Sequence, residues 1–293
     1  MKVSIGIPFF NPGPVFREAI ASVLNQTFED FELILLDDGS SDNALSIAQS
    51  FADPRIKVIS DGKNKGLPAR LNELIELSSG DYIARMDADD LISPDRLQLQ
   101  VNFLNTRQTI DLVSTGICSI TDDAKVLGYR KPQESPLSNA SISDAIYGRV
   151  NIAHATIMAR KSWYQRNQYN ETAKLMEDYQ LWIDAAIKDD LNVGYIVTPL
   201  YFYREESSVS SRKAINAYKN QLSLVKENYL NYLSWPEKFK FTLTMRFKML
   251  VVLMLNSFNT TNLLMSLRNK STEQHEPELM ALQQQLDDIR SQV

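Results

Sequence analysis

The chain contains few of the residues that would place it in several large classes of proteins. Cys118 is the only cysteine, so no internal disulfide can form, as is typical of a protein from a reducing compartment. Because His154 and His275 are the only histidines, a multi-histidine zinc site is not expected. The longest apolar run, 249–255, is far shorter than the roughly 18 residues of a membrane-spanning helix. We therefore expect neither a disulfide framework nor a membrane span.

Charge and targeting signals narrow the class further. The net charge of −5 argues against a general nucleic-acid-binding protein. Residues 1–5 lead straight into a strand-like run, without the basic and apolar regions of a signal peptide. We expect a cytoplasmic protein, either free or peripheral at the inner face of a membrane. The 293 residues, 44% of them hydrophobic, suffice for one large domain with an appendage or for two domains.

Strand and helix patterns alternate along the first part of the chain. Strands are predicted at 3–8, 31–36, 56–59, 82–86 and 112–120, and helices at 15–25, 44–51, 67–77 and 94–105. This alternation predicts an α/β fold with a mostly parallel, Rossmann-like sheet and flanking helices. Ligands of such sheets bind beyond the carboxyl ends of the strands. The loops 8–11, 37–40 and 87–90 all follow strands, so we expect them at that edge.

The character of the chain changes after residue 212. Short strands are predicted at 194–197 and 200–203, followed by helices at 214–233 and 238–256 with a break at Trp235-Pro236. We divide the chain into a catalytic unit at 1–212, a C-terminal helical extension at 213–270, and a polar tail at 271–293 with a short helix. The second long helix interleaves basic and apolar residues. It either lies at a membrane surface or packs its apolar face on the catalytic unit.

Three carboxylates in four positions, Asp87-Ala88-Asp89-Asp90, follow the apolar run at 82–86. Carboxylates this close repel one another unless they stay hydrated or share a cation. Aspartate oxygens suit Mg²⁺ or Mn²⁺, and Mg²⁺ commonly sits between carboxylates and the phosphates of a substrate. The cluster is therefore either a metal and nucleotide-diphosphate site or a solvated acidic turn.

Five motifs in order give the chain a family resemblance. They are Ile7-Pro8-Phe9-Phe10-Asn11, Asp37-Asp38-Gly39-Ser40-Ser41-Asp42, Asn64-Lys65-Gly66-Leu67, the cluster at 87–90, and Glu177-Asp178. Together they resemble the family 2 glycosyltransferases of GT-A fold, over roughly residues 1–210. The resemblance implies inverting transfer of a sugar from a nucleotide-diphosphate donor, a UDP-sugar in our interpretation, to an acceptor hydroxyl. It also implies a product such as a cell-surface polysaccharide, made on a glycan or lipid-linked glycan.

The resemblance assigns a nucleotide and donor site. Its residues are Pro8, Asn11, Asp37, Lys65, Gly66, Arg70, Asp87, Ala88, His154 and Arg204. The carboxylate of Asp37 can accept the imide N–H of uracil. Several of these assignments have a structural alternative: a turn or helix cap at 38–42, a solvated Lys65, an ion pair of Arg70 with Glu73, a structural His154, and a salt bridge between Arg204 and a neighbouring acid.

The resemblance also assigns the metal ligands and the base. Asp89, with Asp87, is expected to hold Mn²⁺ or Mg²⁺, while Asp90 supports the site or caps the next turn. Asp178 is expected to be the general base, with Glu177 contacting the acceptor. The alternative is that both acids only complement the dipole of the helix that they begin.

One position departs from the family pattern. Glu206 stands where a histidine is expected after Tyr203-Arg204, which puts the usual metal or diphosphate contact there in doubt. We expect the segment 207–213 to be a lid over the donor.

The loop after the first strand bears on two other enzyme classes, and Glu206 bears on a non-enzyme function. A sugar nucleotidyltransferase would need a Gly-rich, Arg-containing loop after the first strand, and a dehydrogenase would need G-x-G-x-x-G there. The loop is instead Phe-Phe-Asn-Pro-Gly-Pro at 9–14. An inactive nucleotide-sugar-binding scaffold stays open because of Glu206.

Overall fold

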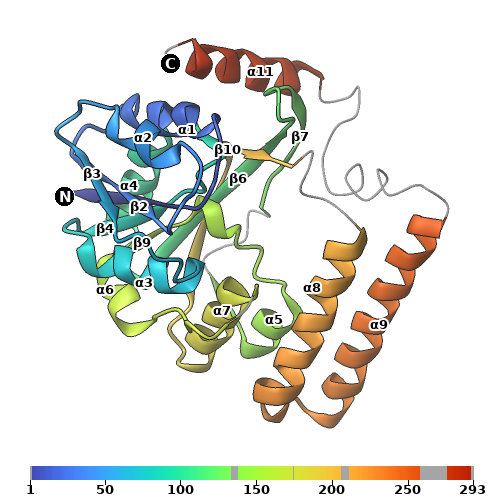
Figure 1. The fold of residues 1–293 in the computed structure, drawn as a ribbon. Coiled ribbons are helices and arrows are strands. Elements are labelled where there is room, and N and C mark those ends of the chain that lie inside the picture. The colour runs from blue at the N-terminus through green and yellow to red at the C-terminus, as the bar shows by residue number, and fades with distance from the viewer. Residues whose placement is uncertain (1, 133–137, 174, 206–210, 258–275, 292–293) are drawn as a thin grey trace.

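The computed structural model describes residues 2–132, 138–173, 175–205, 211–257 and 276–291 (Figure 1). The strands form one ten-stranded sheet in the order β3-β2-β1-β4-β9-β6-β10-β5, with β7 on β6 and β8 on β10. Their bounds are β1 Val3–Phe9, β2 Phe31–Asp37, β3 Ile56–Ser60, β4 Tyr82–Arg85, β5 Leu91–Ile92, β6 Leu112–Ile120, β7 Val126–Arg130, β8 Ser138–Asn139, β9 Met158–Arg160 and β10 Asn192–Arg204.

Helices cover both faces of this sheet. Their bounds are α1 Phe16–Leu24, α2 Ala44–Gln49, α3 Leu67–Leu77, α4 Arg96–Thr106, α5 Ile142–Tyr147, α6 Lys161–Arg166, α7 Glu177–Ile187, α8 Ser211–Leu224, α9 Trp235–Ser257 and α11 Glu276–Arg290. The strands β3, β2, β1 and β4 are mutually parallel, and so are β6 and β10, whereas β9 is antiparallel to both of its neighbours. The predicted α/β fold, with its mostly parallel sheet and C-terminal helices, is confirmed.

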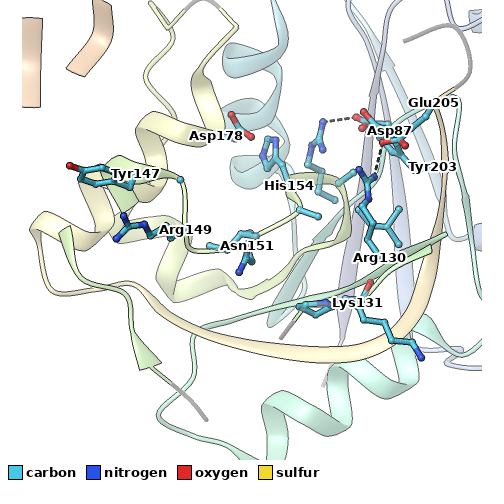
Figure 2. A pocket seen from close by; sticks show the side chains of 18 of the residues that line it. Asp87, Arg130, Lys131, Tyr147, Arg149, Asn151, His154, Asp178, Tyr203 and Glu205 are labelled. Atoms are coloured by element: carbon cyan, nitrogen blue, oxygen red, sulfur yellow. Dashed lines mark hydrogen bonds and ion pairs between the residues drawn. The ribbon is translucent and has the colours of Figure 1, made fainter. Parts of the chain in front are cut away.

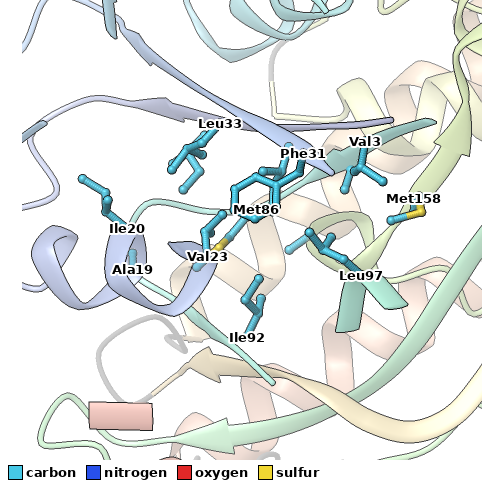
Figure 3. Packing of buried hydrophobic residues seen from close by; sticks show 14 of the residues in the cluster. Val3, Ala19, Ile20, Val23, Phe31, Leu33, Met86, Ile92, Leu97 and Met158 are labelled. Carbon is cyan, nitrogen blue, oxygen red and sulfur yellow. The ribbon is translucent and has the colours of Figure 1, made fainter. Parts of the chain in front are cut away.

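Apolar periodicity explains how the layers pack. All seven residues of β2 are buried, as expected for a strand covered by helices on both faces. Figure 3 shows one core, in which Ile20 and Val23 of α1 and Leu97 of α4 pack against Val3 and Leu33 of the sheet. A second core on the opposite face joins α3 and α5–α7. The sheet is thus a rigid, doubly covered platform.

The contact between β1 and α3 depends on a glycine. A Cβ at Gly6 would lie 1.9 Å from Cδ1 of Leu74, so only glycine lets α3 approach the strand this closely. Register then aligns the strand ends, since Phe9 of β1 is opposite Asp37 of β2 and Gly6 is opposite Arg85 of β4. The loops after these three strands therefore meet at one edge, as predicted.

Two details differ from the expectations. The segments at 194–197 and 200–203 form a single strand, β10, whose register with β6 shifts on both sides of Pro199, which has no N–H to donate. The helix α9 begins at Trp235, and Pro236 lies in its first turn, where a missing N–H is tolerated. The break therefore comes earlier, in a short 3₁₀ helix at Leu230–Tyr232.

The C-terminal helices occupy two different places. The pair α8 and α9 pack side by side at one side of the molecule, whereas α11 lies over β7 and α1 (Figure 1). Leu286 and Ile289 of α11 are buried against Cys118 and Phe202. The proposed boundaries at 212 and 270 stay a prediction. Within the described ranges, none of the helices has the length and apolar character needed to cross a bilayer.

Candidate active site

A large cavity opens at the carboxyl edge of the sheet. Its volume is about 1200 Å³, and its walls come from β4, β6, β7, α5, α7, α9 and the short 3₁₀ helix at His154–Thr156. Asp87, His154 and Asp178, which are 91 residues apart at the extremes, line it together. Figure 2 shows Asp178 and His154 next to each other, with Asp87 further along the same cavity. The fold therefore joins the acidic cluster to the start of α7.

The three aspartates of the cluster have different surroundings. Asp87 is half-buried and forms an ion pair with Arg85, a buried residue at the end of β4. Asp90 is fully buried and accepts hydrogen bonds from Oη of Tyr201 (2.7 Å) and from the backbone N–H of Arg204 (2.8 Å). Burial and the charges of Asp87 and Asp89 raise the pKa of Asp90 well above its ordinary value. Asp90 therefore supports the turn from inside.

Asp89 is the exposed member of the cluster. The surrounding protein displaces part of its water, and Asp87 lies nearby, so the pKa of Asp89 is raised. A bound cation would favour the ionised carboxylate and so oppose both of these upward shifts. Among the described residues, no group of three or more His, Cys, Asp or Glu is placed to hold a metal. Since Mg²⁺ often uses one or two carboxylates together with phosphates, Asp89 with Asp87 still fits a divalent cation.

The acids after β2 are held by hydrogen bonds. Asp37 accepts from the N–H of Ser40 (2.9 Å) and from Oγ of Ser60 (2.7 Å). Asp38 accepts from the backbone N–H groups of Lys65 and Gly66, with 2.7 Å to the former. The backbone N–H groups of the 64–66 loop therefore bind an anion of the protein itself, the carboxylate of Asp38.

Arg70 of α3 also belongs to this hydrogen-bond network. Its buried guanidinium pairs with Asp38 at 2.9 Å, Asp61 at 2.6 Å and Glu73 at 2.8 Å. Lys65 pairs with the same Asp61 and Glu73 at the surface. The alternative foreseen for Arg70, an ion pair with Glu73, is therefore present alongside two others, and both cations are engaged within the protein.

The loops after β1 and β2 are tied together. Oδ1 of Asn11 accepts from the N–H groups of Ser41 and Asp42 at 2.7 and 3.2 Å. Gly39 has a φ of 78°, and a Cβ there would lie 3.0 Å from the carbonyl carbon of Lys63. Pro8, Asn11, Asp37, Lys65, Gly66 and Arg70 thus share the sheet edge with the acidic cluster, although they do not line the cavity described above.

Asp178 is the second residue of α7 and faces the cavity. Its Oδ1 accepts from the N–H of Tyr179 at 2.7 Å. Burial raises the pKa of Asp178, while that hydrogen bond and the charge of Arg85 partly oppose the shift. Burial and the nearby Asp178 also raise the pKa of Glu177. A carboxylate whose pKa is raised in a cavity suits a general base.

His154 lines the same cavity in an aromatic setting. Its Nε2 is 2.7 Å from Oη of Tyr169, and its ring stands edge-on to Trp182. Burial and the charge of Arg85 lower the pKa of His154 well below its ordinary value, so the imidazole is neutral. A neutral ring can position a ligand through one donor or acceptor nitrogen.

Arg204 fastens β10 to the acidic cluster. Its guanidinium pairs with Glu18 at 2.7 Å and donates to the backbone oxygen of Asp89 at 2.6 Å. The foreseen alternative of a salt bridge is therefore observed, with an acid distant in sequence. Glu206 and most of the expected lid lie outside the described residues, and residues 211–213 begin α8.

Sequence reasoning missed several residues of the site. Arg85 and Tyr201 hold Asp87 and Asp90, and the only sequence signal was a charged residue within the apolar run at 82–86. It also missed a basic wall, which consists of Lys131, Arg149 and Lys248. Arg149 and Lys131 contact acids only at the protein surface, at 3.7 Å from Asp144 and 3.2 Å from Glu278 respectively.

The sequence is similar to a known family of proteins. The family model for glycosyl transferase family 2 matches residues 4–167. A protein of Bacillus subtilis (strain 168), provisionally named glycosyltransferase EpsE, is 34% identical over 219 residues, which are 73% of this chain and 76% of that protein.

Two solved structures share the fold. S. aureus TarS 1–349 in complex with UDP-GlcNAc has a TM-score of 0.60 at 18% identity, and the match covers 100% of this chain and 82% of that one. The mannosyltransferase PcManGT of Pyrobaculum calidifontis, in complex with GDP-Man and Mn²⁺, has a TM-score of 0.61 at 13% identity, covering 99% and 86%. The predicted GT-A architecture is confirmed by these likenesses.

Proposed function

Because the chain belongs to glycosyl transferase family 2 and is a glycosyltransferase, we propose that it transfers a sugar from a UDP-sugar to an acceptor hydroxyl with inversion. The observation that carries this proposal is the cavity that Asp87 and Asp178 line together. It offers a place for the donor beside one carboxylate and for an acceptor hydroxyl beside the other. The UDP-GlcNAc bound by TarS, which shares the fold, supports the choice of donor.

Asp178 acts as the base in this proposal. As the acceptor oxygen attacks the anomeric carbon, its proton passes to the carboxylate of Asp178. The bond between that carbon and the diphosphate breaks on the opposite face, and UDP leaves. One displacement of this kind inverts the anomeric centre. Glu177, one residue earlier in the same helical turn, is proposed to contact the acceptor.

The donor is held along the sheet edge. We assign the nucleotide to Pro8, Asn11, Asp37, Lys65 and Gly66, supported by Arg70, and the sugar side to Asp87, Ala88 and His154, supported by Arg204. Oδ1 of Asp37 accepts from Ser40 and Oδ2 from Ser60, and a carboxylate oxygen can accept a second hydrogen bond from a base N–H. The contacts of Arg70 and Arg204 within the protein assign them mainly to holding Asp38 and the acidic cluster in place.

Asp89 and Asp87 would hold a divalent cation, Mn²⁺ or Mg²⁺. Such a cation, when bound, neutralises charge that develops on the departing diphosphate. The exposure of Asp89 and its raised pKa support this assignment. The Mn²⁺ found with GDP-Man in PcManGT, a protein of the same fold, agrees with it.

The basic wall indicates the chemistry of the acceptor. Arg149 is exposed, and Lys248 is half-buried with its Nζ 5.5 Å from the centre of the Tyr218 ring. Lysine and arginine in a cavity suit phosphate or carboxylate groups. We therefore propose a glycan acceptor that carries such groups, free or linked to a lipid, as in the synthesis of a cell-surface polysaccharide. Peripheral contact of the C-terminal helices with the inner face of a membrane would bring a lipid-linked acceptor within reach.

The test is turnover of a panel of UDP- and GDP-sugars with phosphate-bearing and neutral glycan acceptors, with and without Mn²⁺. We expect transfer from one UDP-sugar, with Mn²⁺, and an inverted anomeric centre in the product by NMR. Donor binding by calorimetry without transfer to any acceptor would instead favour a nucleotide-sugar-binding scaffold. Retention of the anomeric configuration would rule out the single displacement.

A further inference from the structure

The outer face of α9 is apolar and exposed. Along the helix, large apolar side chains recur every three or four residues and so form one stripe. Its members, with their exposed fractions, are Trp235 (80%), Phe239 (65%), Leu243 (57%), Phe247 (63%), Leu250 (47%) and Met254 (52%). We call this set the α9 stripe. From its first to its last residue it runs for about 30 Å at 1.5 Å per residue.

The opposite face of α9 is already used for packing. Phe241, Met245 and Val252 are buried, and the ring of Phe241 stands edge-on to Tyr147 of α5. Thr244 and Lys248, on the same side, line the cavity. The α9 stripe is therefore not the face that holds the helix to the protein. A helix with an apolar stripe on each of two faces needs a partner for the second stripe besides the protein core.

The size of the α9 stripe separates it from scattered surface residues. At roughly 150–250 Å² for a large apolar side chain, the exposed fractions amount to several hundred Å². Monomeric soluble proteins rarely expose a contiguous apolar patch larger than that without a binding role.

The charged residues of α9 indicate what kind of partner the α9 stripe binds. The helix carries four cations, Lys238, Lys240, Arg246 and Lys248, and one acid, Glu237, although the whole chain has a net charge of −5. The carboxylate of Glu237 accepts hydrogen bonds from the hydroxyl groups of Ser234 and Ser143. Lys240 and Arg246 are exposed next to the α9 stripe. A second copy of the chain, paired symmetrically through this face, would bring these like charges together.

We propose that the α9 stripe lies in the interface of an anionic lipid bilayer, with Lys240 and Arg246 at the level of the headgroups. Apolar side chains on one face with flanking cations are what such a surface binds. Trp235 and Phe239 stack with their ring centres 6.5 Å apart at the first turn, and aromatic rings favour the water–lipid boundary. The cavity wall formed by Lys248 would then lie close to the membrane. Membrane binding by the α9 stripe does not depend on the proposed function. Only its purpose, access to a lipid-linked acceptor, rests on that function.

Trp235 provides the measurement. It is 80% exposed, whereas Trp163 and Trp182 are buried, so a change of emission on binding reports Trp235. We expect a blue shift when vesicles of phosphatidylcholine with about one third phosphatidylglycerol are added, and co-sedimentation of the protein with them. Pure phosphatidylcholine vesicles should bind at least tenfold more weakly, and added salt should weaken binding to the anionic ones. Neither donor nor acceptor is present, so failure here is separate from failure of the proposed function.

Variants define the face. Phe239→Ser with Phe247→Ser keeps the reporter and should lower the affinity for anionic vesicles at least tenfold. Lys240→Gln with Arg246→Gln should lower it roughly fivefold for each charge removed. The matched control is Leu99→Ser with Met280→Ser, two exposed apolar residues on α4 and α11, which should leave binding unchanged. Circular dichroism and thermal melts confirm that each variant is folded.

Two results would overturn the proposal. The first is no sedimentation and no emission shift with anionic vesicles at millimolar lipid. The second is a blue Trp235 emission without vesicles, which would show that another part of this chain or a second copy covers the α9 stripe. Sedimentation velocity separates these two: a dimer that Phe239→Ser with Phe247→Ser dissociates identifies the second copy.

Discussion

The guanidinium of Arg70 and the carboxylate of Asp38 form a buried ion pair, with Nε 2.9 Å from Oδ1. The same carboxylate accepts the backbone N–H groups of Lys65 and Gly66. Three segments, the loop after β2, the 64–66 loop and the first turn of α3, are thereby fixed at the sheet edge where we place the nucleotide. Arg70 therefore supports that edge indirectly, by holding Asp38.

Arg70→Gln is expected to lower the free energy of unfolding by about 3–5 kcal/mol, because it leaves the buried carboxylate of Asp38 without its cation. The measurement is urea denaturation. Lys65→Gln is the matched control, since Lys65 pairs with the same Asp61 and Glu73 at the surface, where ion pairs contribute little, so its loss should be much smaller. Equal losses in the two variants would contradict the role given to Arg70.

Asp178→Asn should lower kcat by roughly 10²–10⁴-fold with donor affinity unchanged, since the amide cannot take the proton of the acceptor. In the unmodified enzyme, kcat should rise with pH as the raised pKa of Asp178 is passed, because only the carboxylate is a base. Steady-state kinetics across pH at saturating Mn²⁺ test this. Glu177→Gln should keep that acid limb. Full activity of Asp178→Asn would remove the assignment.

Asp89→Asn should weaken the binding of UDP with Mn²⁺ at least about tenfold. Removing a residue that only hydrogen-bonds a metal ligand already lowers metal affinity by that factor, and Asp89 is proposed to be a ligand itself. Calorimetry with and without EDTA measures it. Stability should not fall, because the exposed Asp89 is repelled by Asp87. Asp90→Asn is the counterpart: it disturbs two buried hydrogen bonds and should lower the free energy of unfolding by about 1–3 kcal/mol. A reversed pattern would exchange their roles.

Arg149→Gln should raise KM for a phosphate-bearing acceptor about tenfold, the scale of one charge-assisted hydrogen bond, and leave kcat unchanged. Acceptor titration at saturating donor measures this. KM for the donor should not move, and Lys219→Gln, an exposed lysine on α8 outside the cavity lining, should change neither value. An unchanged acceptor KM in Arg149→Gln would exclude the basic wall from acceptor binding.

Glu32 should make stability depend on acid. Burial raises the pKa of this carboxyl, but hydrogen bonds from Lys57, Ser4 and Ser79 outweigh burial and bring the pKa to about 2, below its ordinary 4.5. The stabilisation is therefore complete above about pH 4.5 and is lost as the pH falls towards 2. It amounts to roughly 3 kcal/mol. Between pH 6 and pH 3, this group should lower the free energy of unfolding of the unmodified protein by about 2 kcal/mol, and the loss should be smaller in Glu32→Gln.

Local patterns in the sequence determine the elements and the edge of the sheet that carries the site. Helix α3 occupies 67–77 as predicted, because Gly66 and Pro68 mark its start and apolar spacing marks its length. The acidic cluster at 87–90 follows a buried strand, and parallel strands bring such ends together. These inferences need only neighbours in sequence and the handedness of connections.

Only the tertiary structure decided which side chains are engaged and which are open. Asp87, Asp89 and Asp90 are chemically alike in sequence, but Arg85 and Tyr201 reach two of them and leave Asp89 exposed. The basic wall joins Lys131, just after β7, and Arg149, just after α5, to Lys248 of α9, which is more than a hundred residues from Lys131. Likewise, two faces of α9 are apolar in sequence, and only the tertiary structure decides which of them packs on α5. Long-range contacts depend on how whole layers fit together, and no local pattern encodes that.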